Sequence, residues 1–244
     1  MSELGRLDAL ILAGGLGTRL RAALPDRPKA LAPVAGRPFL FHLLDHLAHQ
    51  GIRRAVLALG HQAAMIREAV ADYRALDLAI SEESRPLDTG GALALARPLL
   101  GSDPVLVLNG DSLAPIDLGL LLQTHRSRHA QATLAALRLA DAARFGSLDL
   151  DADGAILAFR EKGKAGPGLV SAGIYLVSRA VLESLAPDQP LSLERAVFPG
   201  LCGRGLYAQA FDAPLLDIGT PESYATAEAF LSRHSPPAIP DRSE

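Results

Sequence analysis

The sequence contains no tryptophan, a single cysteine and few aromatic residues. Aromatic side chains make up only 5% of the 244 residues and hydrophobic residues 49%, so leucine, alanine and valine must build the interior. One cysteine, Cys202, excludes an intrachain disulfide and any metal cluster made of cysteines. No base stands beside Cys202 in the sequence, and we therefore predict a structural role for it.

Long apolar runs and a strong net charge are also absent. No segment reaches the roughly 18 apolar residues of a membrane helix, and acidic Glu3 and Asp8 interrupt the region where a signal peptide would be apolar. The net charge of −3 at pH 7 argues against a general nucleic-acid-binding surface. We therefore expect a cytoplasmic protein with no membrane or nucleic-acid partner, in which any cationic site is local.

Short apolar runs alternate with helical patterns in the first half of the chain, which predicts a mostly parallel, doubly wound sheet. From Thr133 the pattern becomes strand-rich, with a hairpin turn predicted at Asp151–Gly154. The predicted strands are Ala9–Ala13, Ala55–Leu59, Leu78–Ile80, Val105–Leu108, Thr133–Leu139, Ser147–Leu150, Ala155–Phe159, Val170–Val177 and Leu206–Phe211. The predicted helices are Phe39–Gln50, about Gln62–Tyr73, Ser178–Leu185, Ser192–Phe198 and Pro221–Arg233.

Three histidines, His42, His46 and His49, share the helix predicted over Phe39–Gln50. A metal site is one interpretation of this spacing. No carboxylate or cysteine completes a ligand set, however, and we favour a polar helix face.

A glycine-rich stretch follows the first predicted strand. Gly14, Gly15 and Gly17 bring free backbone N–H groups into a tight turn, and such turns bind phosphate anions. Arg19 and Lys29 add two positive charges, a combination that suits a triphosphate. The stretch does not match a dinucleotide fingerprint, because leucine replaces the third glycine, nor a P-loop, because no Gly-Lys-Ser/Thr follows.

Two aspartates, Asp111 and Asp217, each follow a short apolar run. Ligands of open α/β sheets collect at the carboxyl ends of the strands, where such carboxylates stand. Taken alone, Asp111 is also consistent with an ordinary turn residue, although a site at the strand end is favoured.

The glycine-rich stretch fits the signature of the sugar-nucleotidyltransferases, or NDP-sugar pyrophosphorylases, nearly residue for residue. That signature is a strand, Gly-Gly-x-Gly-Thr-Arg-Leu and then Pro-Lys-x-x-x-Pro-x-x-x-x-Pro. Pro86–Ala92, Phe159–Lys162 and Leu216–Pro221 match further motifs, and the resemblance extends over about residues 8 to 230. It implies a Rossmann-like three-layer α/β/α, GT-A-like domain over residues 1–233, with a small strand-rich sugar-binding portion. The nucleotide-binding half would cover about 1–112, the sugar-phosphate half 113–233, and 234–244 a disordered tail.

The resemblance also implies the roles of individual residues. Arg19, Lys29, Asp111 and Asp217 would carry catalysis, and Asp111 and Asp217 would bind Mg²⁺, a hard ion that usually takes one or two carboxylates. The nucleotide-binding residues would be Leu12, Ala13, Gly14, Gly15, Gly17, Thr18, Arg19, Lys29, Leu87, Thr89, Gly90 and Asp111. The sugar-phosphate-binding residues would be Asn109, Gly146, Glu161, Lys162 and Ser171.

Within the sugar-phosphate set, Glu161 would hold sugar hydroxyls and Lys162 the sugar phosphate. Ser171 stands where relatives usually have asparagine, which weakens one expected sugar contact. Asp88 stands where relatives often have glycine, and we expect it to face solvent.

The implied reaction is transfer of a nucleotidyl group from a nucleoside triphosphate to a sugar 1-phosphate, with release of pyrophosphate. Its nucleophile is a phosphate oxygen that is already ionised at pH 7, so no general base is needed. This agrees with the lack of a Gly-x-Ser-x-Gly motif. Catalysis then consists of positioning and charge neutralisation.

The runs LDTGGA, FGSLDLDADGAILAFREK and SAGIYLVSR are most similar to the D-glycero-D-manno-heptose 1-phosphate guanylyltransferases, which serve surface polysaccharide synthesis. We therefore predict GTP, with Glu82 or Asp88 helping main-chain groups to bind guanine. Mannose 1-phosphate guanylyltransferases and N-acetylmuramate 1-phosphate uridylyltransferases remain alternatives. A non-catalytic regulatory subunit is disfavoured, because Arg19, Lys29 and both aspartates are retained. The sequence leaves a homo-oligomer open.

Overall fold

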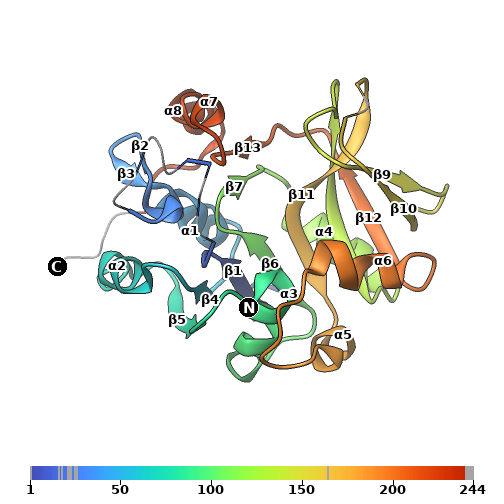
Figure 1. Ribbon diagram of the computed structural model, residues 1–244, viewed down its shortest axis with the longest axis horizontal. Coiled ribbons are helices and arrows are strands. Elements are labelled where there is room, and N and C mark those ends of the chain that lie inside the picture. Colours follow the sequence, from blue (N-terminus) through green and yellow to red (C-terminus); the bar gives the residue numbers. More distant parts are fainter. Residues whose placement is uncertain are drawn as a thin grey trace.

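A mixed sheet runs through the middle of the molecule (Figure 1). The computed structural model describes residues 2–239 apart from 16, 18, 21–23, 25, 26 and 164. In that part of the chain, the strands follow the order β10-β9-β11-β6-β1-β4-β5, and β8 and β12 join beside β11. The strands are β1 (Asp8–Leu12), β4 (Arg54–Leu59), β5 (Asp77–Glu82), β6 (Val105–Asn109), β8 (Ala132–Leu139), β9 (Ser147–Leu150), β10 (Ile156–Arg160), β11 (Gly168–Val177) and β12 (Leu206–Phe211).

Parallel pairing dominates the half of the sheet that contains the N-terminal strands. β1 pairs in parallel with β4 and β6, and β4 pairs in parallel with β5. β12 is parallel to β8, whereas β11 runs antiparallel to both β6 and β8. β9 and β10 form the predicted antiparallel hairpin around Asp151–Gly154. The α/β fold with a mostly parallel sheet is therefore confirmed, and the strand-rich portion lies on the side of β9, β10 and β12 (Figure 1).

Helices cover both faces of the sheet and complete three layers. On one face, apolar side chains pack from α1 (Phe39–His49), α2 (Ala63–Ala69) and α4 (Leu118–Ser127). On the other, they pack from α3 (Asp88–Ala96), α5 (Arg179–Ser184) and α6 (Phe198–Leu201). The short helical turns are η1 (Leu4–Arg6), η2 (Lys29–Leu31), η3 (Arg97–Leu99) and the π-helical η4 (Leu193–Val197).

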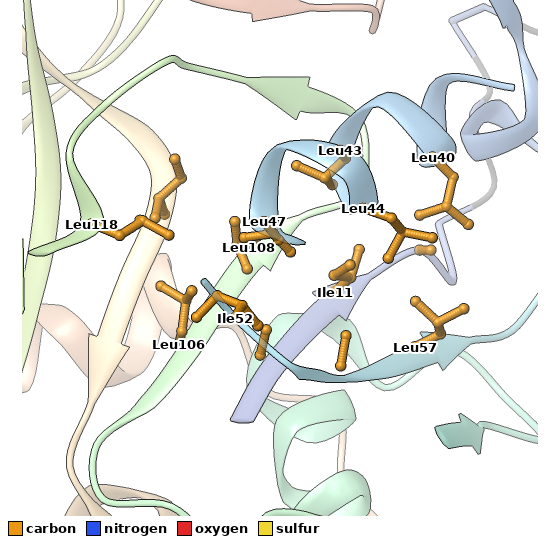
Figure 2. Packing of buried hydrophobic residues seen from close by; sticks show 14 of the residues in the cluster. Ile11, Leu40, Leu43, Leu44, Leu47, Ile52, Leu57, Leu106, Leu108 and Leu118 are labelled. Carbon is orange, nitrogen blue, oxygen red and sulfur yellow. The ribbon is translucent and has the colours of Figure 1, made fainter. Parts of the chain in front are cut away.

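Successive residues of each central strand pack in the apolar layers on opposite faces of the sheet. In β1, Ile11 packs beneath α1, whereas Leu10 packs on the opposite face with α3. Figure 2 shows Leu43, Leu44 and Leu47 of α1 above the strand residues, Ile11 among them. Burying each such leucine stabilises the fold by about 1.5–3 kcal/mol. Because both faces are covered, these strands are apolar throughout, which is why they could be predicted.

A third, smaller cluster lies beside the main sheet. It joins α7 (Pro221–Tyr224) and α8 (Ala227–His234) to the two-stranded pairs β2 (Pro33–Val34) with β3 (Arg37–Pro38), and β7 (Ser112–Leu113) with β13 (Leu216–Asp217). Leu231 and Ile218 are among its buried residues.

Four predicted elements differ from the structure. The helix predicted over about Gln62–Tyr73 is α2, which ends at Ala69, and the Ala71 N–H then bonds to the Glu68 carbonyl at 3.2 Å in a tighter turn. The single helix predicted over Pro221–Arg233 is two helices. A capping box of Thr220 and Ser223 begins α7, which ends after one turn, where the N–H and the Oγ1 of Thr226 both donate to the Ser223 carbonyl, at 3.2 and 2.8 Å. The helix predicted over Ser192–Phe198 is η4 followed by α6, which restarts with Pro199 in its first turn, where proline is tolerated. α8 continues through His234, the residue at which a tail was predicted to begin. Residues 240–244 lie outside the described part.

The histidines of α1 bond to neighbouring groups, as a polar helix face predicts. His42 Nε2 lies 2.9 Å from the Val34 carbonyl, and His49 Nδ1 lies 2.8 Å from the Asp45 carbonyl. His46 Nε2 lies 2.9 Å from Gln50 Nε2. The described residues contain no group of three or more His, Cys, Asp and Glu side chains placed to hold a metal.

Two other sequence-based expectations concern membrane-spanning helices and Cys202. Within the described ranges, every helix is too short or too polar to cross a membrane. Cys202 lies half-buried at the end of α6, with Sγ 3.8 Å from the Phe198 carbonyl. Burial raises the pKa of its thiol, which is consistent with the structural role predicted for it.

Buried His125 should make the protein less stable in acid. Its Nδ1 lies 2.9 Å from Thr133 Oγ1, and burial lowers the pKa of His125 to about 4. The unfolded chain, with a histidine pKa near 6.5, therefore binds more protons between pH 6.5 and 4, so stability falls as pH falls through this window. We expect a loss of up to about 2 kcal/mol between pH 7 and pH 5.

Urea denaturation of the wild type and of His125→Asn at both pH values measures this effect. The variant should show a clearly smaller difference between pH 7 and pH 5. Equal differences in the two proteins would contradict the assignment.

Candidate active site

The candidate site lies where β1, β4 and β6 end. Two cavities, of about 340 and 180 Å³, open there and share Leu12, Gly15 and Asp111 in their walls. The larger, here called the base-side cavity, is lined by Leu12, Gly14, Gly15, Ala58, Glu83, Pro86, Asp88, Thr89, Ala92, Asn109, Asp111 and Glu194. The smaller, here called the phosphate-side cavity, is lined by Leu12, Ala13, Gly15, Gly17, Arg19, Lys29, Ala30, Gly110, Asp111 and Gly219.

Glycines allow the first loop to lie close to its neighbours. A Cβ on Gly14 would lie 3.1 Å from both Glu83 Oε1 and the Gly60 nitrogen, and Gly17 has a left-handed φ of +58°. A Cβ on Gly110 would lie only 2.8 Å from the Leu12 carbonyl, so the ends of β1 and β6 meet only with glycine there. Thr18, predicted to bind nucleotide, lies outside the described residues.

The two aspartates are brought together by the antiparallel pair β7 and β13. In this pair Asp217 is opposite Ser112, the residue after Asp111. The Ile218 N–H also donates to the Asp111 carbonyl at 3.0 Å. Nothing in the apolar pattern predicted this pairing, because each strand has only two residues.

Lys29 lies between the two carboxylates. Its ammonium is 2.6 Å from Asp111 Oδ2 and 3.7 Å from Asp217 Oδ1, and the side chain is only 12% exposed. Asp217 Oδ1 also accepts the Gly219 N–H at 2.7 Å. Both carboxylates therefore face one point that a cation can reach, and two hard oxygen donors with room for water and phosphate oxygens fit Mg²⁺.

The loop at the start of α3 is tightly held. Gly90 N–H donates to the Leu191 carbonyl at 2.7 Å, and a Cβ on Gly91 would lie 2.4 Å from the Gln189 carbonyl. Asp88 has a φ of +59°, which explains why glycine suits this position in the family that the sequence resembles. Asp88 is exposed, as expected, and forms an ion pair with Arg195. Leu87 is buried and does not line either cavity.

Of the two carboxylates predicted to help bind guanine, Asp88 lines the base-side cavity, whereas Glu82 does not and the neighbouring Glu83 lines it instead. Glu82 is exposed and forms a surface ion pair with Arg67. Glu83 Oε2 accepts the Leu87 N–H at 3.1 Å. Burial raises the pKa of Glu83, and the charge of Asp88 raises it further, whereas the Leu87 hydrogen bond lowers it. β5 ends between these two residues, so their side chains point in different directions.

The predicted sugar-phosphate residues are not all brought together. Asn109 lines the base-side cavity and lies against Gly173, where a Cβ would be 2.4 Å from Asn109 Nδ2. Ser171 Oγ accepts the Gly173 N–H at 3.3 Å. Gly146, Glu161 and Lys162 belong to the β9–β10 region, and none of them is among the described residues that line the two cavities. Glu161 and Lys162 are exposed.

Sequence reasoning missed Glu194, which enters the base-side cavity from η4. Glu194 accepts hydrogen bonds from Thr89 Oγ1 at 2.8 Å, Ser192 Oγ at 3.0 Å and Tyr175 OH at 3.0 Å. Tyr175 is fully buried and packs edge-on against Phe198, with ring centroids 5.0 Å apart. A single carboxylate in a short polar segment has no periodic signature, so only the fold reveals its position.

The glycine loop, Arg19, Lys29 and the two adjoining aspartates thus lie together at the ends of the strands. The sequence profile of the family described as nucleotidyl transferase matches residues 8–234, and the chain belongs to this family. The predicted class of enzyme is thereby confirmed.

Relatives with assigned names share much of the chain. A mannose-1-phosphate guanylyltransferase of Mycobacterium tuberculosis is 37% identical over 96% of this chain and 67% of its own length. A D-glycero-alpha-D-manno-heptose 1-phosphate guanylyltransferase of Aneurinibacillus thermoaerophilus is 32% identical over 93% of this chain and its entire length. The crystal structure of HddC from Yersinia pseudotuberculosis complexed with GMP-PN superposes with a TM-score of 0.83. It is 31% identical and covers 92% of this chain and 99% of its own.

Proposed function

We propose that this protein transfers a guanylyl group from GTP to a sugar 1-phosphate, D-glycero-D-manno-heptose 1-phosphate, and releases pyrophosphate. The observation that carries the proposal is the position of Lys29 between Asp111 and Asp217, beside the glycine loop. This arrangement places one ammonium group and two carboxylates at the point where the triphosphate and the sugar 1-phosphate, both negatively charged, would meet.

The residues of the phosphate-side cavity suit binding of the triphosphate. Main-chain amides of Gly14, Gly15 and Gly17, together with Arg19 and Lys29, hold phosphate oxygens and offset their mutual repulsion. The acceptor phosphate is already ionised, so these residues orient it toward the α-phosphorus and do not remove a proton.

Asp111 and Asp217 would hold Mg²⁺, which supplies positive charge to the phosphate oxygens when it is bound. The two aspartates fix the position of that charge through the β7–β13 pair.

Guanine is the base that the base-side cavity suits best. Guanine presents N1–H and N2–H₂ donors, and Glu83 is an acceptor that lies against Gly14 and Gly60 in the wall of the cavity. A site built on such bonds discriminates strongly, because a wrong base leaves buried polar groups unpaired. The names of the relatives support the same base.

Heptose is proposed as the sugar because the relative that this chain covers completely is a heptose 1-phosphate guanylyltransferase. Mannose 1-phosphate is the second candidate, supported by the relative at 37% identity. Lys162 and Glu161 remain the proposed contacts for the sugar phosphate and sugar hydroxyls. We further propose a cytoplasmic enzyme that supplies surface polysaccharide synthesis.

A matrix of four nucleoside triphosphates and several sugar 1-phosphates, with pyrophosphate release as the readout, tests this function. We expect GTP with heptose 1-phosphate to give the highest kcat/KM. A preference for UTP with N-acetylmuramate 1-phosphate would assign the chain to the uridylyltransferases. Binding of nucleotide without turnover of any pair would indicate a regulatory subunit.

A further inference from the structure

Glu194 connects the two substrate regions of the base-side cavity. Thr89, which donates to Glu194, lies in the loop assigned to the nucleotide, and Tyr175 lies on β11 with Ser171, in the motif assigned to the sugar. The segment that carries Glu194 is itself tied to the nucleotide loop. The Leu193 N–H donates to Thr89 Oγ1 at 2.8 Å, and the Leu191 N–H donates to the Leu87 carbonyl at 2.9 Å.

The hydrogen bonds of Glu194 leave one acceptor position open. A carboxylate offers about four lone pairs. Oε2 accepts from Thr89 and Ser192, whereas Oε1 accepts only from Tyr175 among the described residues. Burial raises the pKa of Tyr175 well above its ordinary value, so this phenol keeps its proton and remains a donor. One position on Oε1 is therefore available in a side chain that lines the cavity.

The charge of Glu194 is also uncompensated by a cation. The ion pairs formed by the described residues do not include Glu194, and its three partners are neutral hydroxyl groups. Arg195, the next residue, pairs with Asp88 instead. A neutral hydroxyl donor suits such a site, because hydrogen bonds to a charged acceptor are stronger than those between neutral groups.

We propose that Glu194 is a specificity-determining residue that accepts a hydrogen bond from a hydroxyl group of the sugar 1-phosphate. The inference rests on the proposed function, which supplies the sugar. Thr89, Ser192 and Tyr175 fix the carboxylate before the substrate arrives, so no side-chain rotation is needed on binding. The ribose of the nucleotide also carries hydroxyl groups, and the experiment separates the two sources.

The test combines enzyme variants with deoxygenated substrates. The full chain and Glu194→Gln are assayed with the preferred sugar 1-phosphate and with its monodeoxy analogues, one hydroxyl removed at a time. The glutamine side chain of this variant can still accept from Thr89 and Ser192, while its amide presents a neutral donor toward the cavity. In the wild type, one analogue should have a kcat/KM at least roughly tenfold below that of the parent sugar. In Glu194→Gln, the same deoxygenation should change kcat/KM by less than about threefold.

Two further measurements complete the design. Tyr175→Phe removes the donor that orients Oε1, and it should reduce the penalty for the same analogue and for no other. The Kd for Mg–GTP, measured without sugar, should stay within about twofold of the wild type in Glu194→Gln. If Glu194→Gln does not fold, Glu194→Asp gives the same comparison, because it withdraws the carboxylate by one methylene group.

The outcomes are distinguishable. If Glu194→Gln lowered kcat/KM by the same factor with the parent sugar and with every analogue, Glu194 would only support the fold. The same variant is also assayed with 2′-deoxy- and 3′-deoxy-GTP; if Glu194→Gln reduced the penalty for removing a ribose hydroxyl, Glu194 would contact the ribose. Either result overturns the inference. Wild-type protein that turns over no sugar 1-phosphate would instead overturn the proposed function.

Discussion

Asp111→Asn and Asp217→Asn should each lower kcat by at least about 100-fold at saturating Mg²⁺. Both carboxylates face the Lys29 ammonium, at 2.6 and 3.7 Å, so each contributes charge at the same point. Asparagine keeps the shape of the side chain and removes that charge, and losses of preorganised charge stabilisation are of this size. Initial rates of pyrophosphate release with GTP and the preferred sugar 1-phosphate measure the effect.

A matched control is Asp212→Asn. Asp212 is 84% exposed and pairs with Arg138 at 3.5 Å, away from the residues that line the two cavities. Its replacement should leave kcat within about twofold of the wild type, since exposed ion pairs contribute little. Removal of Mg²⁺ by a chelator should abolish pyrophosphate release by the wild type. Near-normal turnover by either site variant would remove that aspartate from the proposed metal site.

Lys29→Met should lower kcat by a similar factor, about 100-fold. Lys29 is the cation that pairs with both aspartates, and negative charge on the departing pyrophosphate grows as the bond to the α-phosphorus breaks.

Lys162→Ala should have a different effect on the kinetics. Its proposed partner is the sugar phosphate, so kcat/KM for that substrate should fall at least about tenfold while nucleotide binding is unchanged.

Calorimetric titration with Mg–GTP, without sugar, tests this division of roles. Lys162→Ala should bind the nucleotide like the wild type, whereas Lys29→Met should bind it with altered affinity or enthalpy. If Lys162→Ala abolished nucleotide binding, Lys162 would not be the sugar-phosphate anchor. Normal kinetics in Lys162→Ala would agree with its exposed position outside the two cavities and would remove it from the site.

The parts of the fold that could be predicted are those in which one local pattern decides the structure. β1, β4 and β6 are apolar on both faces, and the glycine loop follows β1 directly. α4 was not predicted, although Asp117 caps it by accepting the Leu120 N–H at 3.1 Å. The division between α7 and α8 was missed because Thr226 bonds to the Ser223 carbonyl through both its N–H and its hydroxyl group, a local arrangement that the continuing apolar pattern does not show.

The site was predictable where a residue follows a strand and not where tertiary contacts place it. Asp111 and Asp217 were found individually, but their proximity depends on β7 and β13, which are too short to show a period. Glu83 and Glu194 were missed because single carboxylates in polar segments are common on any surface. The Thr89–Glu194–Tyr175 bonds join residues that lie far apart in the sequence.

The pairing of β7 with β13 also determines when Asp111 and Asp217 can come together during synthesis. A nascent chain that has emerged as far as β7 already contains the glycine loop, Lys29 and the first aspartate. Asp217 and its partner strand leave the ribosome only after the β8–β12 portion has been made. Closing so long a loop is one of the later events of folding. Incomplete chains therefore lack both Asp217 and Gly219, so the pair of carboxylates and the complete wall of the phosphate-side cavity form only when the C-terminal segment has docked.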